Sequence, residues 1–136
     1  MLPTVAEIQA FLAEEFPQAT IEVLAADEKG ARVRQPIGFS HLRPGGTVSG
    51  PTMMALADTA AYVAIFGRLG IIPLAVTTSL NINFMSKPAP DRALIADAEL
   101  LKVGTRLVVA DARIYSEGEP TLLAQASITY SIPPRR

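Results

Sequence analysis

The stretch GGTVSGPTMMALADTAAYVAIFGRL, residues 45–69, decides how the rest of the chain is interpreted. It begins as a loop of small residues. Pro51 then marks the first turn of a helix, because the fixed φ of proline suits that turn and its missing N–H is not needed there. From Thr52 to about Leu69 the residues are helix formers and nearly all apolar. A helix that is apolar on every face is expected to be buried on every face. We therefore predict a central core helix.

Asp58 is the only Asp, Glu, Lys, Arg or His between Pro44 and Gly67. A carboxylate among core residues is costly unless it is hydrogen-bonded or paired. One interpretation is structural, a carboxylate that binds nearby N–H groups and holds a loop in place. The other is catalytic, since chemistry is a common reason for a carboxylate in an apolar groove. The helix alone leaves both interpretations open.

The composition bounds the class of protein. A length of 136 residues predicts one domain, residues 1–136, and 49% apolar against 18% charged residues is enough apolar material for a core. The mean hydropathy of +0.30 is high for so small a domain and suggests further burial at a subunit interface. The net charge of −1 gives no indication of nucleic-acid binding.

Cysteine and histidine usage bounds the chemistry. The chain has no cysteine, which excludes disulfides, a thiol nucleophile and a thiolate metal site. The single histidine, His41, is expected to be an ordinary loop residue and does not favour a site built from several histidines. We expect no metal and no cofactor. The first residues carry acidic and no basic side chains, unlike a signal peptide, so we expect a cytoplasmic protein without membrane association.

An amphipathic helix is predicted at residues Thr4–Phe16, ahead of the central helix. Thr4 and Glu7 have the spacing of a capping box, in which the two side chains satisfy free N–H groups of the first turn. Pro17 ends the pattern, because the residue before a proline is disfavoured in the helical conformation.

Six stretches of alternating apolar and polar residues predict strands, and turns join them as hairpins. Pro36 places the second strand at a sheet edge, because proline cannot donate to a strand ladder. Strands outnumber helices, so the expected architecture is α+β, with one antiparallel sheet curled round the apolar helix. The second face of that helix and the exposed sheet edges would favour a partner subunit. The predicted strands are Ala19–Ala26, Ala31–Ile37, Leu74–Met85, Ala93–Val103, Leu107–Tyr115 and Thr121–Ile132.

Three stretches, in the same order and with preserved spacing, resemble the hotdog-fold acyl-CoA thioesterases of the PaaI-like group. Together they span about residues 20–131, and the resemblance implies the hotdog fold, a curved antiparallel sheet wrapped round one long helix, with an additional N-terminal helix. The stretches are the loop and helix GTVSGP…LADTA (residues 46–60), the strand VTTSLNINFM with the following KPA (76–89), and the hairpin LKVGTRL with the closing AQASITY (101–130).

The resemblance also implies site residues. Asp58 matches the carboxylate that acts as general base on water or as nucleophile on the thioester. Gly50 matches the glycine whose backbone N–H points at the thioester oxygen, where hydrolysis builds negative charge that an N–H at a helix start can stabilise. Thr77 matches a hydroxyl position on the long strand, and its neighbour Thr78 is the alternative if the register differs by one residue.

Three positions depart from the family pattern. Ser49 stands where the family has histidine, and it either replaces part of that hydrogen bonding or caps the helix, the role we favour. Pro51 stands where the family has a second glycine and offers no N–H. Arg43 stands where an asparagine is frequent. It is interpreted as a contact to the substrate carbonyl, a partner of Asp58, a contact to a carboxylated acyl group, or an ordinary loop charge.

The resemblance implies an acyl- or aryl-CoA as substrate and partner. The acyl group would lie in an apolar tunnel, and the CoA phosphates would lie near strand ends and the subunit seam, where solvated turn charges are the alternative interpretation. The tunnel residues would include Met53, Met54 and Tyr62, and the candidate phosphate contacts are Lys87, Arg92, Lys102 and Arg106.

Three functions compete. The first is a homo-oligomeric acyl-CoA thioesterase, a dimer or dimer of dimers whose sites form across the dimer seam. The second is a hydratase or dehydratase of the same fold, which ranks lower because such sites usually need a histidine beside the carboxylate and His41 is in the wrong place. The third is a non-catalytic acyl-CoA or small aromatic ligand binder, which would have no need of Asp58.

Overall fold

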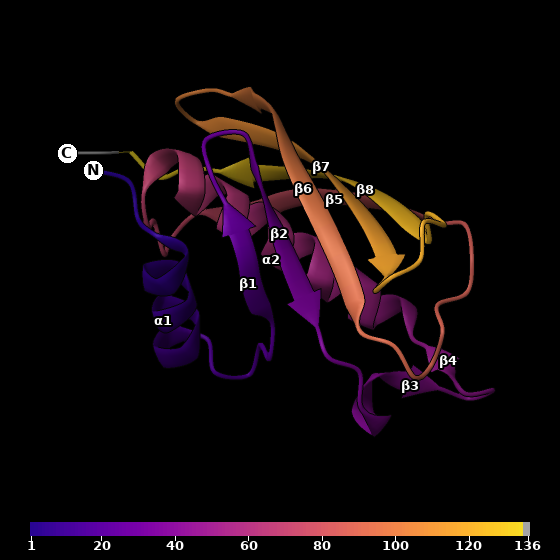
Figure 1. The fold of residues 1–136 in the computed structure, drawn as a ribbon. Coiled ribbons are helices and arrows are strands. Elements are labelled where there is room, and N and C mark those ends of the chain that lie inside the picture. The colour runs from indigo at the N-terminus through magenta and orange to yellow at the C-terminus, as the bar shows by residue number, and fades with distance from the viewer. Residues whose placement is uncertain (135–136) are drawn as a thin grey trace.

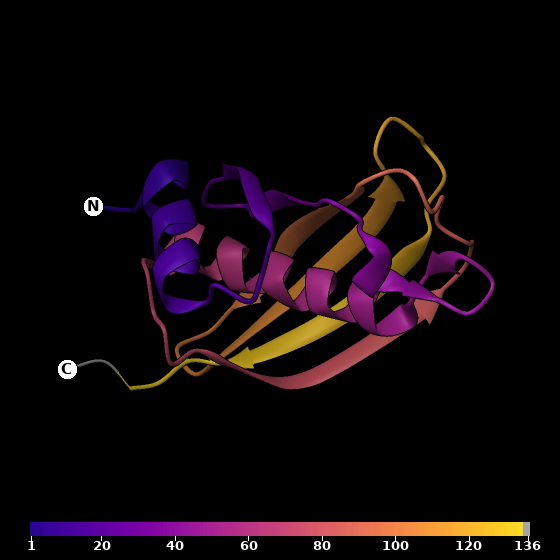
Figure 2. The same cartoon turned by 90° about the horizontal axis from the view of Figure 1, so that it is seen from below.

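The long helix α2 (Gly50–Leu69) lies along one face of an antiparallel sheet, as Figure 1 and the view from below in Figure 2 show. The structure is a computed structural model that describes residues 1–134. Within that range the main sheet has six strands, and a separate two-stranded sheet lies near the start of α2, so the predicted α+β architecture is confirmed. The other elements are α1 (Val5–Glu15), β1 (Glu22–Ala26), β2 (Gly30–Gln35), the 3₁₀ turn η1 (Phe39–His41), β3 (Leu42–Arg43), β4 (Thr47–Val48), β5 (Val76–Phe84), β6 (Leu94–Val103), β7 (Leu107–Ser116) and β8 (Ala124–Ser131).

The strand order corrects two predictions. The main sheet runs β1-β2-β6-β7-β8-β5, so β2 pairs with a strand on each side and the predicted edge position is wrong. Pro36 follows the last residue of β2, where its missing N–H costs the ladder nothing. Strand β5 pairs with β8 and not with its successor β6. The turn after β5 is therefore a crossover connection and not a hairpin.

Helix α2 begins and ends where the sequence predicts. The Ser49 hydroxyl accepts a hydrogen bond from the Thr52 N–H at 3.3 Å, and Pro51 occupies the first turn. Gly70 follows the helix with a φ of +96°, a conformation that favours glycine. Near this end Gly67 is packed so closely that a Cβ atom would lie 2.8 Å from the Asp27 carbonyl oxygen. The absence of a side chain there lets α2 approach the β1–β2 turn.

One stripe of α2 contradicts the prediction of burial on every face. Most of the helix is buried against the sheet, with Leu56, Ala60 and Phe66 fully enclosed. Pro51, Met54 and Ala55 are exposed, however, while Asp58 and Tyr62 are half-buried. These positions are three or four residues apart, so they form one continuous stripe. A single chain leaves that stripe open.

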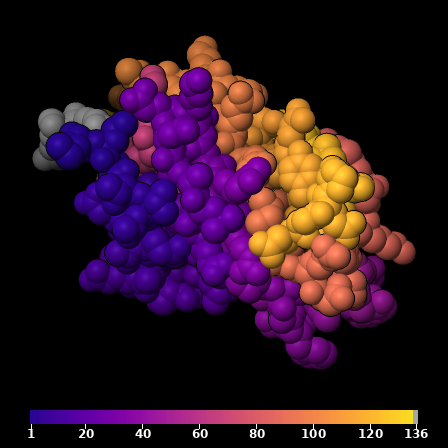
Figure 3. All heavy atoms as spheres, viewed as in Figure 1, coloured from indigo at the N-terminus to yellow at the C-terminus, as the bar shows by residue number. Residues whose placement is uncertain are grey.

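Helix α1 covers the far end of α2 and is fixed to the sheet edge. Its predicted capping box is confirmed, because the Thr4 and Glu7 side chains each accept from the other residue's N–H. The Gln9 side chain accepts from the Val23 N–H at 2.6 Å and donates to the Ile21 carbonyl at 3.2 Å. In Figure 3 the indigo and violet residues of α1, β1 and β2 form one surface beside the later strands.

Strand β5 is the other edge of the sheet, and most of its residues are exposed on both faces. The side chains of Val76 and Phe84, at its two ends, are 53% and 50% exposed. A long apolar edge strand presents unpaired N–H and C=O groups that favour pairing with another chain. The fold thus leaves two adjacent surfaces open, β5 and the stripe on α2.

Candidate active site

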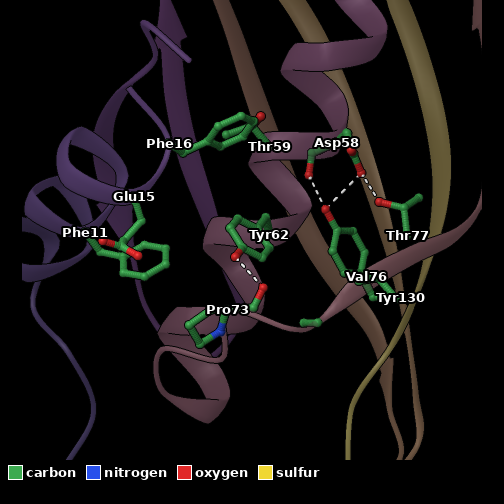
Figure 4. Close-up of a pocket in the computed structure, with 11 residues that line it drawn as sticks. Phe11, Glu15, Phe16, Asp58, Thr59, Tyr62, Pro73, Val76, Thr77 and Tyr130 are labelled. Carbon is green, nitrogen blue, oxygen red and sulfur yellow. Dashed lines mark hydrogen bonds between the residues drawn. The ribbon is translucent and has the colours of Figure 1, made fainter. Parts of the chain in front are cut away.

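The carboxylate of Asp58 is held by hydroxyl groups from two neighbouring strands. Thr77 on β5 and Tyr130 on β8 are directly paired residues of the sheet. The Thr77 hydroxyl donates to Asp58 Oδ1 at 2.6 Å, and the Tyr130 hydroxyl lies 2.9 Å from the same oxygen (Figure 4). The Tyr130 hydroxyl also lies 3.0 Å from the Asp58 backbone carbonyl. The sheet therefore fixes one oxygen of the carboxylate that α2 presents.

The register of β5 separates Thr77 from Thr78. The pairing with β8 shifts between Thr77 and Ser79, so Thr78 occupies a bulge. The Thr78 hydroxyl donates to the Thr129 carbonyl at 3.3 Å instead of reaching Asp58. Of the two hydroxyls that the sequence left open, Thr77 is the one beside the carboxylate.

Tyr130 is a site residue that the sequence analysis missed. It is only 4% exposed, and burial together with the nearby Asp58 charge raises the pKa of its phenol. The phenol therefore keeps its proton and can donate it in a hydrogen bond. One signal was available, because Tyr130 is the single hydroxyl-bearing residue in the inward row of β8, after Ala126 and Ile128, and a buried tyrosine needs a polar partner.

We call the space next to this carboxylate the Asp58 cavity. It has a volume of about 380 Å³ and contains four aromatic rings. Tyr62 donates to the Pro73 carbonyl at 2.9 Å, and burial raises the pKa of its phenol. The charged residues of the lining, Asp58 and Glu15, are both acidic. The lining comprises Phe11, Glu15, Phe16, Asp58, Thr59, Tyr62, Pro73, Ala75, Val76, Thr77 and Tyr130.

A second space, which we call the Gly50 cavity, lies at the start of α2. It has a volume of about 370 Å³, and its charged residues, Arg43 and Lys87, are both basic. Gly50 is the first residue of the helix, where backbone N–H groups have no partner within the helix and favour negative charge. A Cβ atom at Gly50 would lie 3.3 Å from the Phe84 ring. The lining comprises Arg43, Thr47, Val48, Gly50, Met53, Phe84, Met85, Ser86, Lys87 and Pro88.

Arg43 is placed by the β3–β4 hairpin. The Gly46 N–H donates to the Arg43 carbonyl at 3.0 Å, and Gly45 between them has a φ of +97°. This turn directs the strand that carries Arg43 to the Gly50 cavity. Of the roles considered for Arg43, pairing with Asp58 is not seen, since residues 1–134 contain no ion pair between them.

Gly50 and Asp58 do not meet within one chain. They are eight positions apart on α2, which corresponds to about 12 Å along the helix axis at about 1.5 Å per residue. They also line different cavities. One thioester carbonyl cannot contact both groups of the same chain.

Ser49 and His41 serve the local structure of the loop. The Ser49 hydroxyl caps α2 and lies 2.8 Å from the Thr52 hydroxyl, so the capping role is confirmed. The Ser49 N–H donates to the His41 carbonyl at 2.8 Å. The imidazole Nδ1 of His41 accepts from the Gly38 N–H at 2.9 Å, which fits the expected loop histidine.

The remaining predicted contacts are spread over the molecule. Met54 lies on the open stripe of α2, whereas Met53 is buried in the Gly50 cavity. Lys102 and Arg106 are exposed near the β6–β7 turn, at the end of the sheet where β5 begins, with β8 between the turn and β5. Lys87 follows the other end of β5. These ends are about 25–30 Å apart along the strand. Arg92 forms an ion pair with Glu119 at 3.5 Å.

The described residues give no support for a metal site or for a membrane-spanning helix. None of their His, Cys, Asp and Glu side chains gather in groups of three or more that could hold a metal ion. No helix in the part of the chain that the structure describes is both long and apolar enough to cross a membrane.

The chain belongs to the thioesterase superfamily. The sequence profile of that superfamily matches residues 45–123, which include α2, Thr77 and the strands β5, β6 and β7 of the main sheet. A candidate thioesterase from Silicibacter sp. TM1040 is 42% identical, with a TM-score of 0.89, and the match covers 96% of this chain and 92% of the other. The fold is the hotdog fold of this superfamily, as the resemblance implied. A comparison with curated proteins finds no match.

More distant structures share the fold. Zebra fish thioesterase superfamily member 2 has a TM-score of 0.85 at 22% identity, and the match covers 96% of this chain and 99% of that protein. A hypothetical thioesterase from Streptococcus pneumoniae, solved with coenzyme A, has a TM-score of 0.75 at 20% identity, with 86% and 91% of the two chains covered. The class of activity that the superfamily defines is thioester hydrolysis.

Proposed function

We propose that this protein hydrolyses an acyl- or aryl-CoA thioester to the free acid and coenzyme A. The observation that carries the proposal is the Asp58 carboxylate, which two hydroxyl groups hold at one oxygen beside an aromatic cavity. A purely structural carboxylate would be expected to bind backbone N–H groups, and the hydrogen bonds recorded for this side chain come instead from Thr77 and Tyr130.

The geometry of Asp58 suits either chemical role. Within residues 1–134 the recorded hydrogen bonds to its side chain end at Oδ1, which leaves Oδ2 for water or for the thioester carbon. As a base, Asp58 takes a proton from water while the water oxygen attacks the carbonyl carbon, and that proton reaches the departing thiolate. As a nucleophile, it displaces the thiolate and forms an anhydride, which water then hydrolyses.

The Gly50 N–H is the proposed donor to the thioester oxygen, and it would come from a second copy of the chain. The separation of about 12 Å on α2 keeps the Gly50 and Asp58 of one chain apart. The open stripe on α2 and the free edge of β5 are exposed surfaces that a two-fold dimer could bury against their own copies. An antiparallel arrangement of two α2 helices would bring the Gly50 of one copy toward the Asp58 of the other. We therefore include a homodimer, or a dimer of dimers, in the proposal.

The charges suggest how coenzyme A lies. Its phosphates are anionic, and the Gly50 cavity contains Arg43 and Lys87. The Streptococcus pneumoniae protein of the same fold was solved with coenzyme A, which supports the choice of ligand. Lys102 and Arg106 remain candidate phosphate contacts from the other end of the sheet.

A non-catalytic binder is the second candidate. The observation that favours it is the reduced set of donors at the start of α2, since Pro51 has no N–H and Ser49 is engaged in capping. A hydratase or dehydratase receives less support, because the residues that line the Asp58 cavity include no histidine.

The test is the release of free thiol from short, medium, long and aryl acyl-CoAs by the wild type and Asp58→Asn. We expect turnover by the wild type and a loss of about 100-fold or more in the variant, equivalent to about 2.7 kcal/mol of barrier. Asp91→Asn, which changes an exposed turn carboxylate, is the matched control and should retain full activity. Tight binding of the esters without turnover of any of them would favour the non-catalytic binder. Equal turnover by the wild type and Asp58→Asn would show that Asp58 takes no part in the mechanism.

A further inference from the structure

A third space adjoins the Asp58 cavity on the side of the α1–β1 connection. It has a volume of about 440 Å³, and no Asp, Glu, Lys or Arg belongs to its lining. Two residues, Phe16 and Thr59, line both this space and the Asp58 cavity. We call it the inner cavity for its place beyond Phe16, although it opens to solvent beside Pro51 and Ala55 of the open stripe on α2. The two side chains therefore form the partition between the inner cavity and the cavity that holds the candidate catalytic carboxylate.

The backbone of Phe16 is hydrogen-bonded on both sides at this partition. It follows the last residue of α1, where its N–H donates to the Leu12 carbonyl at 2.9 Å and its carbonyl accepts from the Ala19 N–H at 3.0 Å. Helix α1 is itself fixed to β1 through Gln9. Figure 4 shows the Phe16 side chain directed from the end of α1 toward Thr59 on α2. Backbone hydrogen bonds on both sides of the residue thus place the point from which its ring projects toward α2.

The charges indicate which part of a substrate meets this partition. The acidic side chains of Asp58 and Glu15 would repel the phosphates of coenzyme A from the Asp58 cavity, whereas Arg43 and Lys87 attract them to the Gly50 cavity. The acyl group is the uncharged end of the ester. It therefore takes the Asp58 cavity, where it faces Phe16.

We propose that Phe16 is the specificity-determining residue of the acyl site. Its ring closes the Asp58 cavity against the inner cavity and restricts the enzyme to compact acyl groups, either short chains or a single aromatic ring. The Asp58 cavity, with about 380 Å³, is near the lower end of the range of about 300–1,000 Å³ for small-molecule sites. Removal of the ring joins it to a further 440 Å³ of uncharged space. This inference rests on the proposed thioester hydrolysis.

The test compares kcat/KM for butanoyl-, benzoyl-, octanoyl- and dodecanoyl-CoA in the wild type and Phe16→Ala. The wild type should prefer butanoyl- and benzoyl-CoA. In Phe16→Ala the ratio of kcat/KM for dodecanoyl-CoA to that for butanoyl-CoA should rise about tenfold or more. Each methylene of the longer chain that contacts apolar protein surface improves transition-state binding. Phe39→Ala is the matched control, since Phe39 is 92% exposed and lines none of the three cavities. It should leave the chain-length profile unchanged.

Two further variants keep the proposal open to contradiction. Thr59→Ala removes the other shared side chain and should shift the ratio in the same direction, even if Phe16→Ala does not fold. Phe16→Trp keeps a ring at the partition and should not raise the ratio. A wild type that prefers dodecanoyl-CoA, or an unchanged ratio in folded Phe16→Ala and Thr59→Ala, would overturn the role of Phe16 while thioester hydrolysis stands.

Failure of the proposed function has a different signature, the absence of turnover by every variant on every ester. The role of Phe16 is then tested by calorimetric binding of non-hydrolysable thioether analogues of the same chain lengths. A gain of about tenfold in affinity for the dodecanoyl analogue in Phe16→Ala, without a gain for the butanoyl analogue, would support the partition. Parallel changes for both analogues would overturn it.

Discussion

Two cavities open along helix α2, and their charged residues have opposite signs. The Gly50 cavity contains Arg43 and Lys87, whereas the charged residues of the Asp58 cavity are Asp58 and Glu15. The first offers backbone N–H groups at a helix start, and the second offers an oriented carboxylate. In the proposed mechanism both groups act on one thioester, the N–H at its oxygen and the carboxylate at its carbon. Because Gly50 and Asp58 of one chain are too far apart to contact the same carbonyl, the proposed mechanism requires two copies of the chain.

The largest effect on kcat is expected from a substitution of Gly50 in the Gly50 cavity. Gly50→Pro removes the N–H, and proline is tolerated at the first helical position. Loss of one donor to a developing oxyanion should lower kcat about 10²-fold or more, measured by thiol release. Gly50→Ala keeps the N–H, although its Cβ lies 3.3 Å from the Phe84 ring, and should stay within about tenfold of the wild type. Equal activity of the two variants would show that the donor lies elsewhere.

On the Asp58 side, the Tyr130 hydroxyl is expected to matter less than the carboxylate that it holds. Tyr130→Phe removes a hydrogen bond of 2.9 Å to Oδ1 and leaves the one from Thr77. Hydrogen bonds to charged groups are worth about 1.5–3 kcal/mol, so kcat should fall by at least about tenfold while KM changes little. Tyr115→Phe, on the opposite face of the sheet, is the control. An unchanged kcat in Tyr130→Phe would mean that Thr77 alone positions Asp58.

The same tyrosine predicts a pH dependence of stability. Burial and the Asp58 charge raise the pKa of Tyr130 in the folded protein above its ordinary value of 10.0. Above that pH the unfolded chain releases the proton that the folded chain keeps, so the free energy of unfolding falls as pH rises. The difference between the wild type and Tyr130→Phe should narrow by up to about 1.4 kcal/mol per pH unit. Urea denaturation from pH 9 to 11 measures it, and parallel curves would contradict the buried environment.

The smallest effect is expected at the charges of the Gly50 cavity. Lys87→Gln should raise KM for a CoA ester several-fold at low salt and leave kcat unchanged, because an exposed charge contributes about 0.2–1 kcal/mol. Raising the ionic strength should reduce the difference from the wild type. Lys102→Gln, at the opposite end of the sheet, is the comparison and should have the smaller effect. The reverse order would place the phosphates at the β6–β7 turn.

Structural features that depend on residues close together in the sequence could be predicted. The Thr4 and Glu7 capping box, the first turn of α2 at Pro51 and the end of α2 before Gly70 depend on neighbouring residues, and the structure bears them out. Asp58 could be singled out because an isolated carboxylate in an apolar helix is costly and therefore conspicuous.

Features that depend on the pairing of strands far apart in the sequence could not be predicted. Nothing near β5 indicates that its partner is β8, and the same pairing determines that Thr77 and not Thr78 faces Asp58. Tyr130 was missed for that reason, since its role appears only when β8 lies beside β5. Pro36 led to the wrong prediction that β2 is an edge strand. The rule for proline concerns residues inside a hydrogen-bonded strand, and β2 ends at Gln35, one residue before Pro36.

In the proposed mechanism Gly50 and Asp58 from different copies act on one substrate. Complementation between two inactive variants, Gly50→Pro and Asp58→Asn, tests it most directly. In a mixed dimer one site contains an intact Asp58 and an intact Gly50, and the other contains neither. Co-expression with two affinity tags isolates the mixed dimers.

Thiol release by the purified mixed dimer should recover to about half of the wild-type rate, since one of its two sites is complete. Each variant alone should remain at its low rate. Recovery would support a site shared between two copies. Mixed dimers that are confirmed by both tags and are no more active than the parent variants would contradict the shared site.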